Sequence, residues 1–560
     1  MFRTDTARNQ DSPLFNFNQD RTHLVSEVCR RAYSEFLSRT RTREHEGLEH
    51  LLNDAAYQEV ERLEVEQGPE DEIRSQSWWL DISKRVGEMS ESEKRAVLRD
   101  LIESYAEDIA GRFNPKVYRL ATGALPFGLS FLFKAQDIKE LPNRFINFYQ
   151  EFKNLRDLTE RVVIEGHTDT LQKLATKGTL VVVPTHSSNM DSILMGWSLF
   201  ESGLPPVTYG AGKNLFTNPL TSFFMHNLGA YKVDRRLKHD LYKSVLKIYS
   251  QVLLERGYHS LFFPGGTRCR SNIVEDHLKL GLLGTTIEAY IHNLLHYGAE
   301  RPLYICPVTI NYNLVLEAES LIDDHLRREG GRRYFLEKDE FNQISQVVRF
   351  SMNTMQMDST TIIRYGRPMD PFGNLVRDDG HSYDQRGRRV DPTSFVRSSK
   401  SGQVTHDAAR DREYTRHTGR RVAQAFRKNT VLMPTQIVAY TLFELLRNRF
   451  PNWDVYELLR LATGEVIPWF RIESMLEETL RALRRRKRDG ELRLSPIAET
   501  GDPAAVQEAG IDSLTSYHVP TVIERMGDGV LLNSLDLLYY YGNRVRTYDL
   551  DGKKLLARSE

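Results

Sequence analysis

The chain has 560 residues, 40% of them hydrophobic, which is enough for about two to four domains and for a core that needs no disulfides. Lysine plus arginine and aspartate plus glutamate both number 76, so the net formal charge is zero and gives no global argument for nucleic-acid binding. The three cysteines are too few and too scattered for a disulfide framework or a zinc site, which favours a reducing, cytosolic compartment.

The opening residues lack the apolar segment of a secretory signal, so we expect none. No run reaches the roughly 18 apolar residues that a membrane-spanning helix needs. The longest near-apolar stretch, residues 120–133, is interrupted by Gly123, Pro126 and Gly128. It suits either a membrane interface or a buried core, and the pattern leaves both open.

Residues 20–112 are predicted to be helical, because apolar residues recur there at three- and four-residue spacing. The pair Asn114-Pro115 ends this pattern. A second helical passage is predicted over residues 143–163.

From about residue 160 short apolar runs alternate with helical patterns. We predict strands over residues 178–186, 205–212, 259–268 and 303–313, and helices over 192–203, 239–257 and 281–298. This alternation predicts an α/β fold with a central, mostly parallel sheet and helices on both faces, flanked by N- and C-terminal helical regions.

Residues 370–425 are polar and rich in Arg, Asp and Gly, which indicates a surface excursion. Helices are predicted again over residues 434–450, 453–464 and 471–490. The basic run 484–488 is either a solvated helix end or a site for anionic headgroups. The expected division is a helical region 1–150, an α/β core 151–370, a polar excursion 371–425 and a helical region 426–560.

The run that ends the first predicted strand carries His186 and, five residues on, Asp191. On a regular helix these residues would lie about 140° apart, so they meet only across a loop or an irregular turn. Ser187, Ser188 and Asn189 favour such a turn, and ligands bind where parallel strands end. A carboxylate on one imidazole nitrogen leaves the other free to take a proton. Because no serine or cysteine nucleophile motif accompanies the pair, it is typical of a base that acts directly on a hydroxyl.

Simpler readings of the pair stay open at this point. Asp191 is also suited to cap the helix that follows it. His186 is also compatible with a satisfied, buried histidine. Metal ligation by the two is disfavoured because no third ligand is evident nearby.

The run GGTRCR combines two glycines with Arg268 and Arg270. Arginine offers a planar fork of donors to a phosphate, and glycines let backbone N–H groups approach it. The spacing is not that of a Walker loop. The plain alternative is a tight turn at Gly265-Gly266 with a surface pair of arginines.

Four ordered blocks of the sequence resemble the glycerolipid acyltransferases, whose signature is His, four residues, Asp. Within them the chain is similar to the membrane-associated glycerol-3-phosphate acyltransferase branch. The blocks are HSSNMD at 186–191, AGKNLFTNPLTSFFMHNLGAYKVDRR at 211–236, FFPGGTRCRS at 262–271 and ICPVTINYNLVLE at 305–317. The flanking residues 104–119 and 431–440 look like segments of the same branch.

The resemblance implies that His186 is the base that deprotonates the acceptor hydroxyl and that Asp191 orients it. Three positions of the third block would shape the phosphate end of the acceptor site, with one arginine from the second block and a supporting proline from the fourth. These are Gly266, Thr267, Arg268, Arg235 and Pro307.

The implied reaction moves an acyl group from acyl-CoA or acyl carrier protein to the C1 hydroxyl of sn-glycerol 3-phosphate. No metal or redox cofactor and no nucleic acid is expected. The acyl chain implies peripheral attachment to the cytoplasmic face of the inner membrane. Alternatives are another acceptor, such as dihydroxyacetone phosphate or lysophosphatidate, or a catalytically silent, lipid-binding relative.

The chain departs from the family pattern at two places. Gly265 stands where the third block usually has Glu, and Glu275, ten residues on, is a candidate replacement. Asp234 in the second block would repel a phosphate unless it pairs with Arg235 or Arg236.

Overall fold

A computed structural model describes residues 12–42, 47–65, 73–123, 162–216, 219–298, 301–329, 360–518 and 521–559. Most of the predicted helical passage 143–163, and residues 124–133 of the near-apolar stretch, lie outside the described residues. The last two residues of that passage, Val162 and Val163, belong to a strand instead of a helix.

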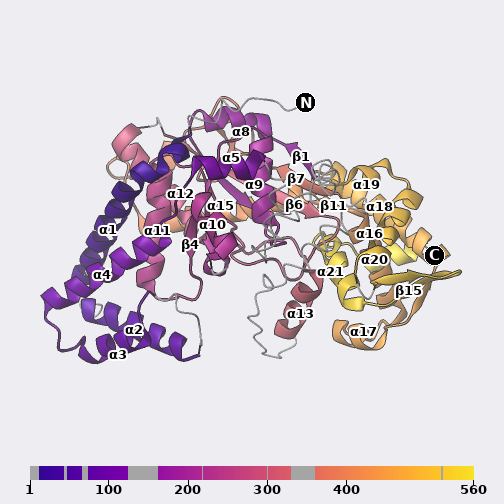
Figure 1. The fold of residues 1–560 in the computed structure, drawn as a ribbon. Helices are drawn as coiled ribbons and strands as arrows, with labels where there is room; N and C mark the ends of the chain where they lie inside the picture. The colour runs from indigo at the N-terminus through magenta and orange to yellow at the C-terminus, as the bar shows by residue number, and fades with distance from the viewer. Residues whose placement is uncertain are drawn as a thin grey trace, which may run out of the picture.

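A seven-stranded sheet with the order β1-β7-β6-β2-β5-β3-β4 forms the centre of the protein (Figure 1). Its strands are β1 (Val162–Gly166), β2 (Thr179–Pro184), β3 (Thr208–Gly212), β4 (Ala230–Val233), β5 (Ser260–Leu261), β6 (Leu303–Tyr312) and β7 (Thr361–Tyr365). The five strands from β6 to β4 are parallel, whereas β7 runs antiparallel to β6 and pairs in parallel with β1. The predicted mostly parallel sheet is confirmed, and the five parallel strands end at one edge.

Strand β2 is buried along its whole length, as expected for the middle of a parallel sheet. Leu180 and Val182 face one hydrophobic cluster, and Val181 and Val183 face another on the opposite side of the sheet. Residues of α8 (Thr168–Ala175) and α9 (Asp191–Glu201) belong to the first cluster. The second cluster takes residues from α11 (Asp240–Glu255), α12 (Leu280–Tyr297) and α15 (Ala408–Asn429). Helices therefore cover both faces, as predicted.

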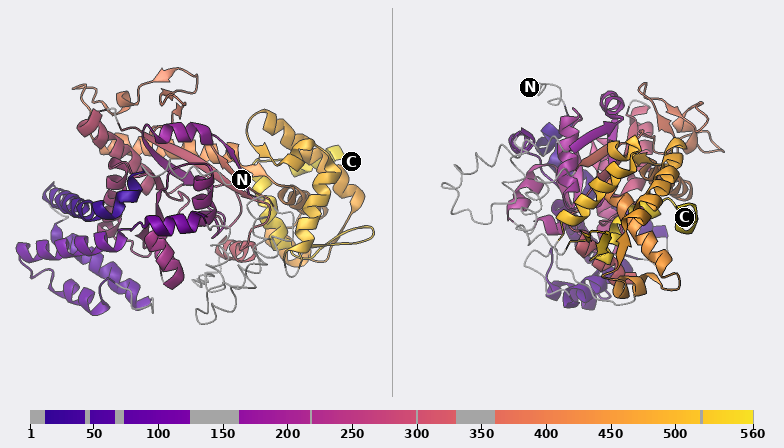
Figure 2. Two further views of the ribbon diagram at one scale, coloured as in Figure 1. Left: turned by 45° about the horizontal axis from the view of Figure 1, so that its top comes forward. Right: turned by 90° about the vertical axis from the view of Figure 1, so that its right-hand side faces the viewer.

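The N-terminal helices form one end of the molecule (Figures 1 and 2). They are α1 (Phe17–Thr42), α2 (Leu48–Val65), α3 (Gln76–Arg85) and α4 (Glu91–Ile109), whereas α5 (Pro115–Gly123) lies beside α9 (Figure 1). Helix α4 begins with a capping box, in which the Ser90 side chain and Glu93 satisfy each other's backbone N–H groups. Apolar residues of α1 and α4 share a cluster with those of α11, which joins this region to the sheet.

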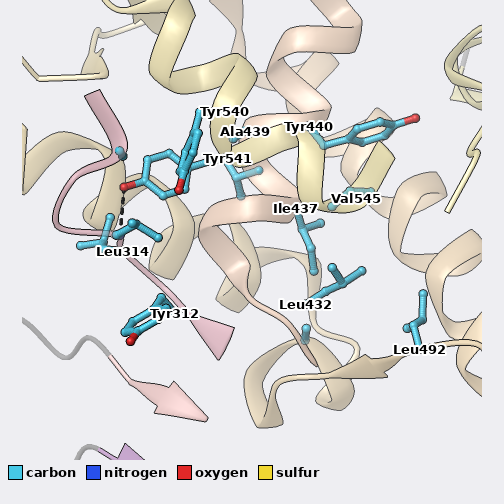
Figure 3. Close-up of a cluster of buried hydrophobic side chains, with 14 of the residues drawn as sticks. Tyr312, Leu314, Leu432, Ile437, Ala439, Tyr440, Leu492, Tyr540, Tyr541 and Val545 are labelled. Carbon is cyan, nitrogen blue, oxygen red and sulfur yellow. Dashed lines mark hydrogen bonds between the residues drawn. The ribbon is translucent and has the colours of Figure 1, made fainter. Parts of the chain in front are cut away.

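The C-terminal region lies at the other end of the molecule (Figure 2). Its helices are α16 (Pro434–Arg449), α17 (Val455–Leu461), α18 (Trp469–Arg488), α19 (Pro496–Thr500), α20 (Pro503–Ser516), α21 (Leu535–Arg546) and α22 (Gly552–Ser559). Thirteen of the sixteen residues of α16 are buried, so it is the central helix of this region. Figure 3 shows that Ile437 from α16, Tyr541 from α21 and Tyr312 from the end of β6 belong to one cluster.

This region is less purely helical than the sequence indicated. Strands β12 (Val466–Pro468), β14 (Ile523–Arg525) and β15 (Gly529–Leu532) form an antiparallel sheet. A separate parallel pair joins β11 (Val431–Leu432) to β13 (Arg493–Leu494). All these strands are only two to four residues long, too short for a reliable period-two signal.

The remaining elements are short. Strands β8 (Leu375–Val376), β9 (Ser382–Tyr383) and β10 (Arg389–Val390) form a small antiparallel sheet within the polar segment, before α15 begins. In the described ranges, the 3₁₀ turns are η1 (Pro13–Asn16), η3 (Lys213–Phe216) and η6 (Pro392–Val396), and the remaining helices are α10 (Pro219–Asn227) and α13 (Ala318–Glu329). The basic run 484–488 forms the last turn of α18.

The division of the chain at residues 150, 370 and 425 stays a prediction. Within the described ranges, no helix combines the length and the apolar character required to cross a bilayer.

We predict that Leu180→Ala lowers the free energy of unfolding by about 2–5 kcal/mol, because it removes a buried side chain from β2 and leaves a cavity. Denaturant unfolding at equilibrium measures the change. Leu295→Ala, at a half-exposed position of α12, is the control and should stay within about 0.5 kcal/mol of the parent. Equal losses in the two variants would contradict the placement of β2.

Candidate active site

The loop between β2 and α9 brings His186 and Asp191 into contact. Nδ1 of His186 lies 2.8 Å from Oδ2 of Asp191. The intervening residues form the irregular turn that the sequence spacing required. Because a carboxylate accepts, Nδ1 carries the proton, and Nε2 keeps its lone pair in the neutral ring.

Asp191 is completely buried, and its carboxylate accepts four hydrogen bonds. Besides His186, the donors are the backbone N–H groups of Ser187 (2.6 Å) and Ser188 (2.9 Å) and the hydroxyl of Tyr312 (2.5 Å). Both N–H groups precede α9, and no side chain caps that helix. The helix-cap reading of Asp191 is therefore wrong, since its carboxylate holds the loop before the helix.

Tyr312 is the last residue of β6, next to β2 in the sheet. Burial, and then the neighbouring Asp191 charge, raise the pKa of its hydroxyl well above the usual range. The group thus stays protonated and remains a donor to Asp191. This bond ties the end of β6 to the start of α9, just after the loop that follows β2.

The imidazole of His186 lies at the border between core and solvent, with 13% of its side chain exposed. One face stacks on the ring of Phe263, with centroids 4.3 Å apart and planes 24° apart. Among the described residues, Nε2 has no hydrogen-bond partner. The reading of His186 as a satisfied core histidine is therefore not supported, because this nitrogen is available to a ligand.

The GGTR turn follows β5, which pairs with β2. Gly266 has a φ of 75°, and a Cβ on it would lie 2.9 Å from Cγ of Lys279, so both conformation and space require glycine. The backbone N–H of Cys269 donates to the carbonyl of His186 at 2.7 Å. Thr267 is exposed beside this contact. The turn and the histidine loop thus form one site.

Arg268 is tied to the same loop through Glu317. Its guanidinium lies 3.3 Å from the Glu317 carboxylate, and 20% of its side chain remains exposed. Glu317 also accepts from the Ser188 hydroxyl and the Asn189 backbone N–H, both at 2.9 Å. Burial raises the pKa of Glu317, although Arg268 and these donors oppose the shift.

Two predicted site residues lie on other strands of the sheet, one at its outer edge and one beside β2. Arg235 is exposed and follows β4, the outermost strand, at the same edge as His186. Its neighbour Asp234 pairs with Arg236 at 2.7 Å, so the predicted repulsion is neutralised locally. Pro307 is buried in the middle of β6, in register with Val183 of β2, and supports the strand that leads to His186.

Three further residues reach the site that the sequence did not single out for a role. Tyr312 and Glu317 lie in the fourth block, where the resemblance noted a tyrosine and an acidic residue. Arg544 belongs to α21 and is 5% exposed, and it donates to the Ser187 hydroxyl at 3.3 Å. No local signal identifies it, because 357 residues separate the partners.

This arrangement can accept a proton at Nε2 of His186, with Asp191 to stabilise the imidazolium, and can hold an anion near Arg268. Among the described residues, no group of three His, Cys, Asp or Glu side chains has the arrangement of a metal site.

Comparison with known proteins gives an independent result. Residues 164–311 match the family model described as Acyltransferase. A glycerol-3-phosphate acyltransferase of Aeromonas hydrophila is 26% identical over 286 residues, which cover 51% of this chain and 28% of that protein. Proteins of the same name from Alteromonas mediterranea and Haemophilus ducreyi are 31% and 35% identical, over 28% of this chain and 19% and 18% of theirs.

The matching region thus spans between 18% and 28% of the length of these relatives. A crystal structure of a 1-acyl-sn-glycerophosphate acyltransferase from Thermotoga maritima aligns with a TM-score of 0.25 and 14% identity, covering 55% of this chain and 91% of that one. That similarity is too low to carry an argument.

The chain contains an acyltransferase domain with distant homology to bacterial glycerol-3-phosphate acyltransferases over part of its length. Such an enzyme needs an acyl donor and an acceptor. His186 and the GGTR turn lie inside the matched range, whereas Glu317 and Arg544 lie beyond it.

We predict that Tyr312→Phe destabilises the protein by about 1.5–3 kcal/mol, because a buried carboxylate loses a hydrogen bond. Tyr365→Phe is the matched control. Its buried hydroxyl bonds the neutral Ser198 side chain at 2.8 Å, so its loss should cost only about 0.5–1.5 kcal/mol. Equilibrium unfolding measures both values, and a larger loss in the control would contradict the role of Asp191 as the charged centre of the loop.

Proposed function

We propose that this protein transfers an acyl group from acyl-CoA or acyl carrier protein to the C1 hydroxyl of sn-glycerol 3-phosphate. The product is 1-acylglycerol 3-phosphate, an intermediate of phospholipid synthesis. The observation that carries the proposal is the joining of a His186–Asp191 pair to a glycine turn with Arg268. A base and a phosphate-binding group are thereby held in one site.

The acceptor binds through its phosphate. Arg268 offers its guanidinium from a side chain that is 20% exposed, and Gly266 and Thr267 present the backbone of the turn. Arg235, at the end of β4, adds charge from the same edge of the sheet. Glu317 fixes the direction of the Arg268 side chain, so less conformational entropy is lost when the phosphate arrives.

The chemistry is one-step acyl transfer. The C1 hydroxyl gives its proton to Nε2 of His186 as its oxygen attacks the thioester carbonyl carbon. Backbone N–H groups of a glycine-rich turn stabilise the oxyanion that forms. The C–S bond then breaks, the thiolate takes the proton back from the imidazolium, and an ester and a free thiol leave. Asp191 stabilises the charged ring throughout, and no metal or redox cofactor enters the sequence of steps.

Two alternatives follow from the sequence. Gly265 replaces the usual Glu of the third block. The first alternative is therefore a different phosphorylated acceptor, such as dihydroxyacetone phosphate or lysophosphatidate. A catalytically silent, lipid-binding relative is disfavoured, because the His186–Asp191 pair and the open Nε2 are intact. Because an acyl chain requires an apolar surface, the proposal includes peripheral association with the cytoplasmic face of the membrane.

We predict that His186→Ala lowers kcat by at least about a hundred-fold, since it removes the base, while acceptor affinity stays within a few-fold. The assay supplies a labelled acyl thioester and each acceptor in turn to the purified protein. His277→Ala is the control, because that side chain is 95% exposed. A His186 variant with a near-native rate would end the base assignment. Wild-type transfer to another acceptor, and none to glycerol 3-phosphate, would overturn the proposed substrate.

We predict that Arg268→Ala chiefly weakens acceptor binding and raises KM for glycerol 3-phosphate about ten-fold or more, because a charge-assisted contact to phosphate is lost. Arg328→Ala on α13 is the control, with a side chain 55% exposed. Steady-state kinetics with varied acceptor distinguish the two parameters. An unchanged KM with a reduced kcat would contradict the assignment of Arg268 to phosphate binding.

A further inference from the structure

Gly265 and Gly266 are adjacent glycines with different requirements. The φ of Gly266 is 75°, in the region that favours glycine, whereas Gly265 has no positive φ. The backbone would therefore accept a side chain at position 265. A side chain at position 265 is excluded by lack of space and not by backbone conformation.

The carboxyl group of Glu275 occupies the space that a side chain on Gly265 would need. A Cβ built there would lie 2.9 Å from the Glu275 carboxyl carbon and 3.4 Å from Oε2, and it would clash with Oε1. Glycine at position 265 is therefore what allows the Glu275 carboxyl to lie where it does. The first position lacks a carboxyl side chain, and the second delivers a carboxyl to the same place.

The surroundings of this carboxyl are those of the active site. Both oxygens are shielded from solvent and have no hydrogen-bond partner among the described residues. The backbone N–H of His186 and the guanidinium of Arg544 lie close enough to favour the ionised form, and Asp191 opposes it. Burial outweighs these influences and raises the pKa of Glu275 to about 8. Cys269, whose backbone N–H donates to the His186 carbonyl, and Lys279, which lies against Gly266, are further titratable groups nearby.

Contacts with α21 and its C-terminal end hold residues 271–274 in the conformation that brings Glu275 to Gly265. The side chain of Asn543 donates to the carbonyl of Ser271 at 3.0 Å, and the hydroxyl of Thr547 accepts from the backbone N–H of Val274 at 3.1 Å. Asn272 has a φ of 62°, and its side chain donates to the carbonyl of Tyr540. These contacts return the chain toward the turn, so that residue 275 points at residue 265.

We propose that Glu275 supplies, from ten residues farther along the chain, the carboxyl group that the acyltransferase pattern carries at position 265. Because its oxygens are shielded, Glu275 is a positioning residue. It sets the GGTR turn against the His186 backbone and against Arg544, and so fixes where the acceptor's phosphate end lies relative to the imidazole. This inference rests on the proposed function for the identity of the acceptor.

The test moves the carboxyl between the two positions. Glu275→Ala should lower kcat/KM about ten-fold or more, because it removes the carboxyl that packs against Gly265 and leaves the turn unsupported there. Gly265→Glu in the Glu275→Ala background restores a carboxyl to the vacated space and should recover most of that loss. Gly265→Glu alone places two carboxyls in one space and should be impaired. Asp276→Ala, at a side chain 81% exposed, is the control and should leave kcat/KM unchanged.

Each outcome decides the inference. Rescue by the double variant, with none by Gly265→Met in the same background, supports it, since Met fills the vacated space without a carboxyl. A folded double variant no more active than Glu275→Ala overturns it. If the double variant does not fold, Glu275→Ala decides alone, and a rate within two-fold of the parent overturns the inference. The acceptor is whichever the wild-type protein uses, so a wrong acceptor leaves these ratios measurable.

A second measurement needs no substrate. The folded pKa of Glu275, about 8, exceeds the ordinary value of 4.5, so the folded protein keeps a proton that the unfolded chain releases. The free energy of unfolding therefore falls between these two pH values, and Glu275→Gln removes that fall. The stability of the Gln variant relative to wild type should increase from pH 5 to pH 8. A difference that stays constant over this range would show that Glu275 is not the buried carboxyl inferred here.

Discussion

The buried carboxylate of Asp191 is the interaction on which the site depends. It receives the imidazole of His186, two backbone N–H groups of the loop and the hydroxyl of Tyr312. A buried, ionised carboxylate is stable only when its oxygens are hydrogen-bonded. Because the loop supplies most of these donors, any rearrangement of the loop would cost the bonds, and it has little freedom to rearrange. The same contacts fix the tautomer of His186 and leave Nε2 open. The Asp191 carboxylate thus determines both the conformation of the loop and the position of the proton on His186.

The parallel sheet places the other parts around this carboxylate. Strands β2, β5 and β6 end at one edge, and they lead to the His186 loop, the GGTR turn and Tyr312, which donates to Asp191. Helix α21, near the C-terminal end of the chain, contacts the His186 loop through the hydrogen bond from Arg544 to Ser187. The C-terminal region is therefore part of the site's support. The matched acyltransferase range, residues 164–311, does not contain all the residues that hold the site together.

The sequence predicted what depends on local pattern. Continuous apolar runs predicted β2 and β6, and three- and four-residue spacing predicted α9, α11 and α12. The spacing of His186 and Asp191 and the turn-forming residues between them allowed the two to meet, and left simpler alternatives open. What it could not give were contacts set by the tertiary fold. Arg544 meets Ser187 across 357 residues, and the carboxyl of Glu275 lies against Gly265 where residues 540–547 hold residues 271–274. The short strands of the C-terminal region likewise depend on partners far away in sequence.

A structure of the protein with bound glycerol 3-phosphate tests the central claim most directly. The account predicts that the C1 hydroxyl lies within about 2.6–3.2 Å of Nε2 of His186, with the phosphate on Arg268 beside the GGTR turn. A phosphate bound away from Arg268, or a C1 hydroxyl turned from the imidazole, would contradict it.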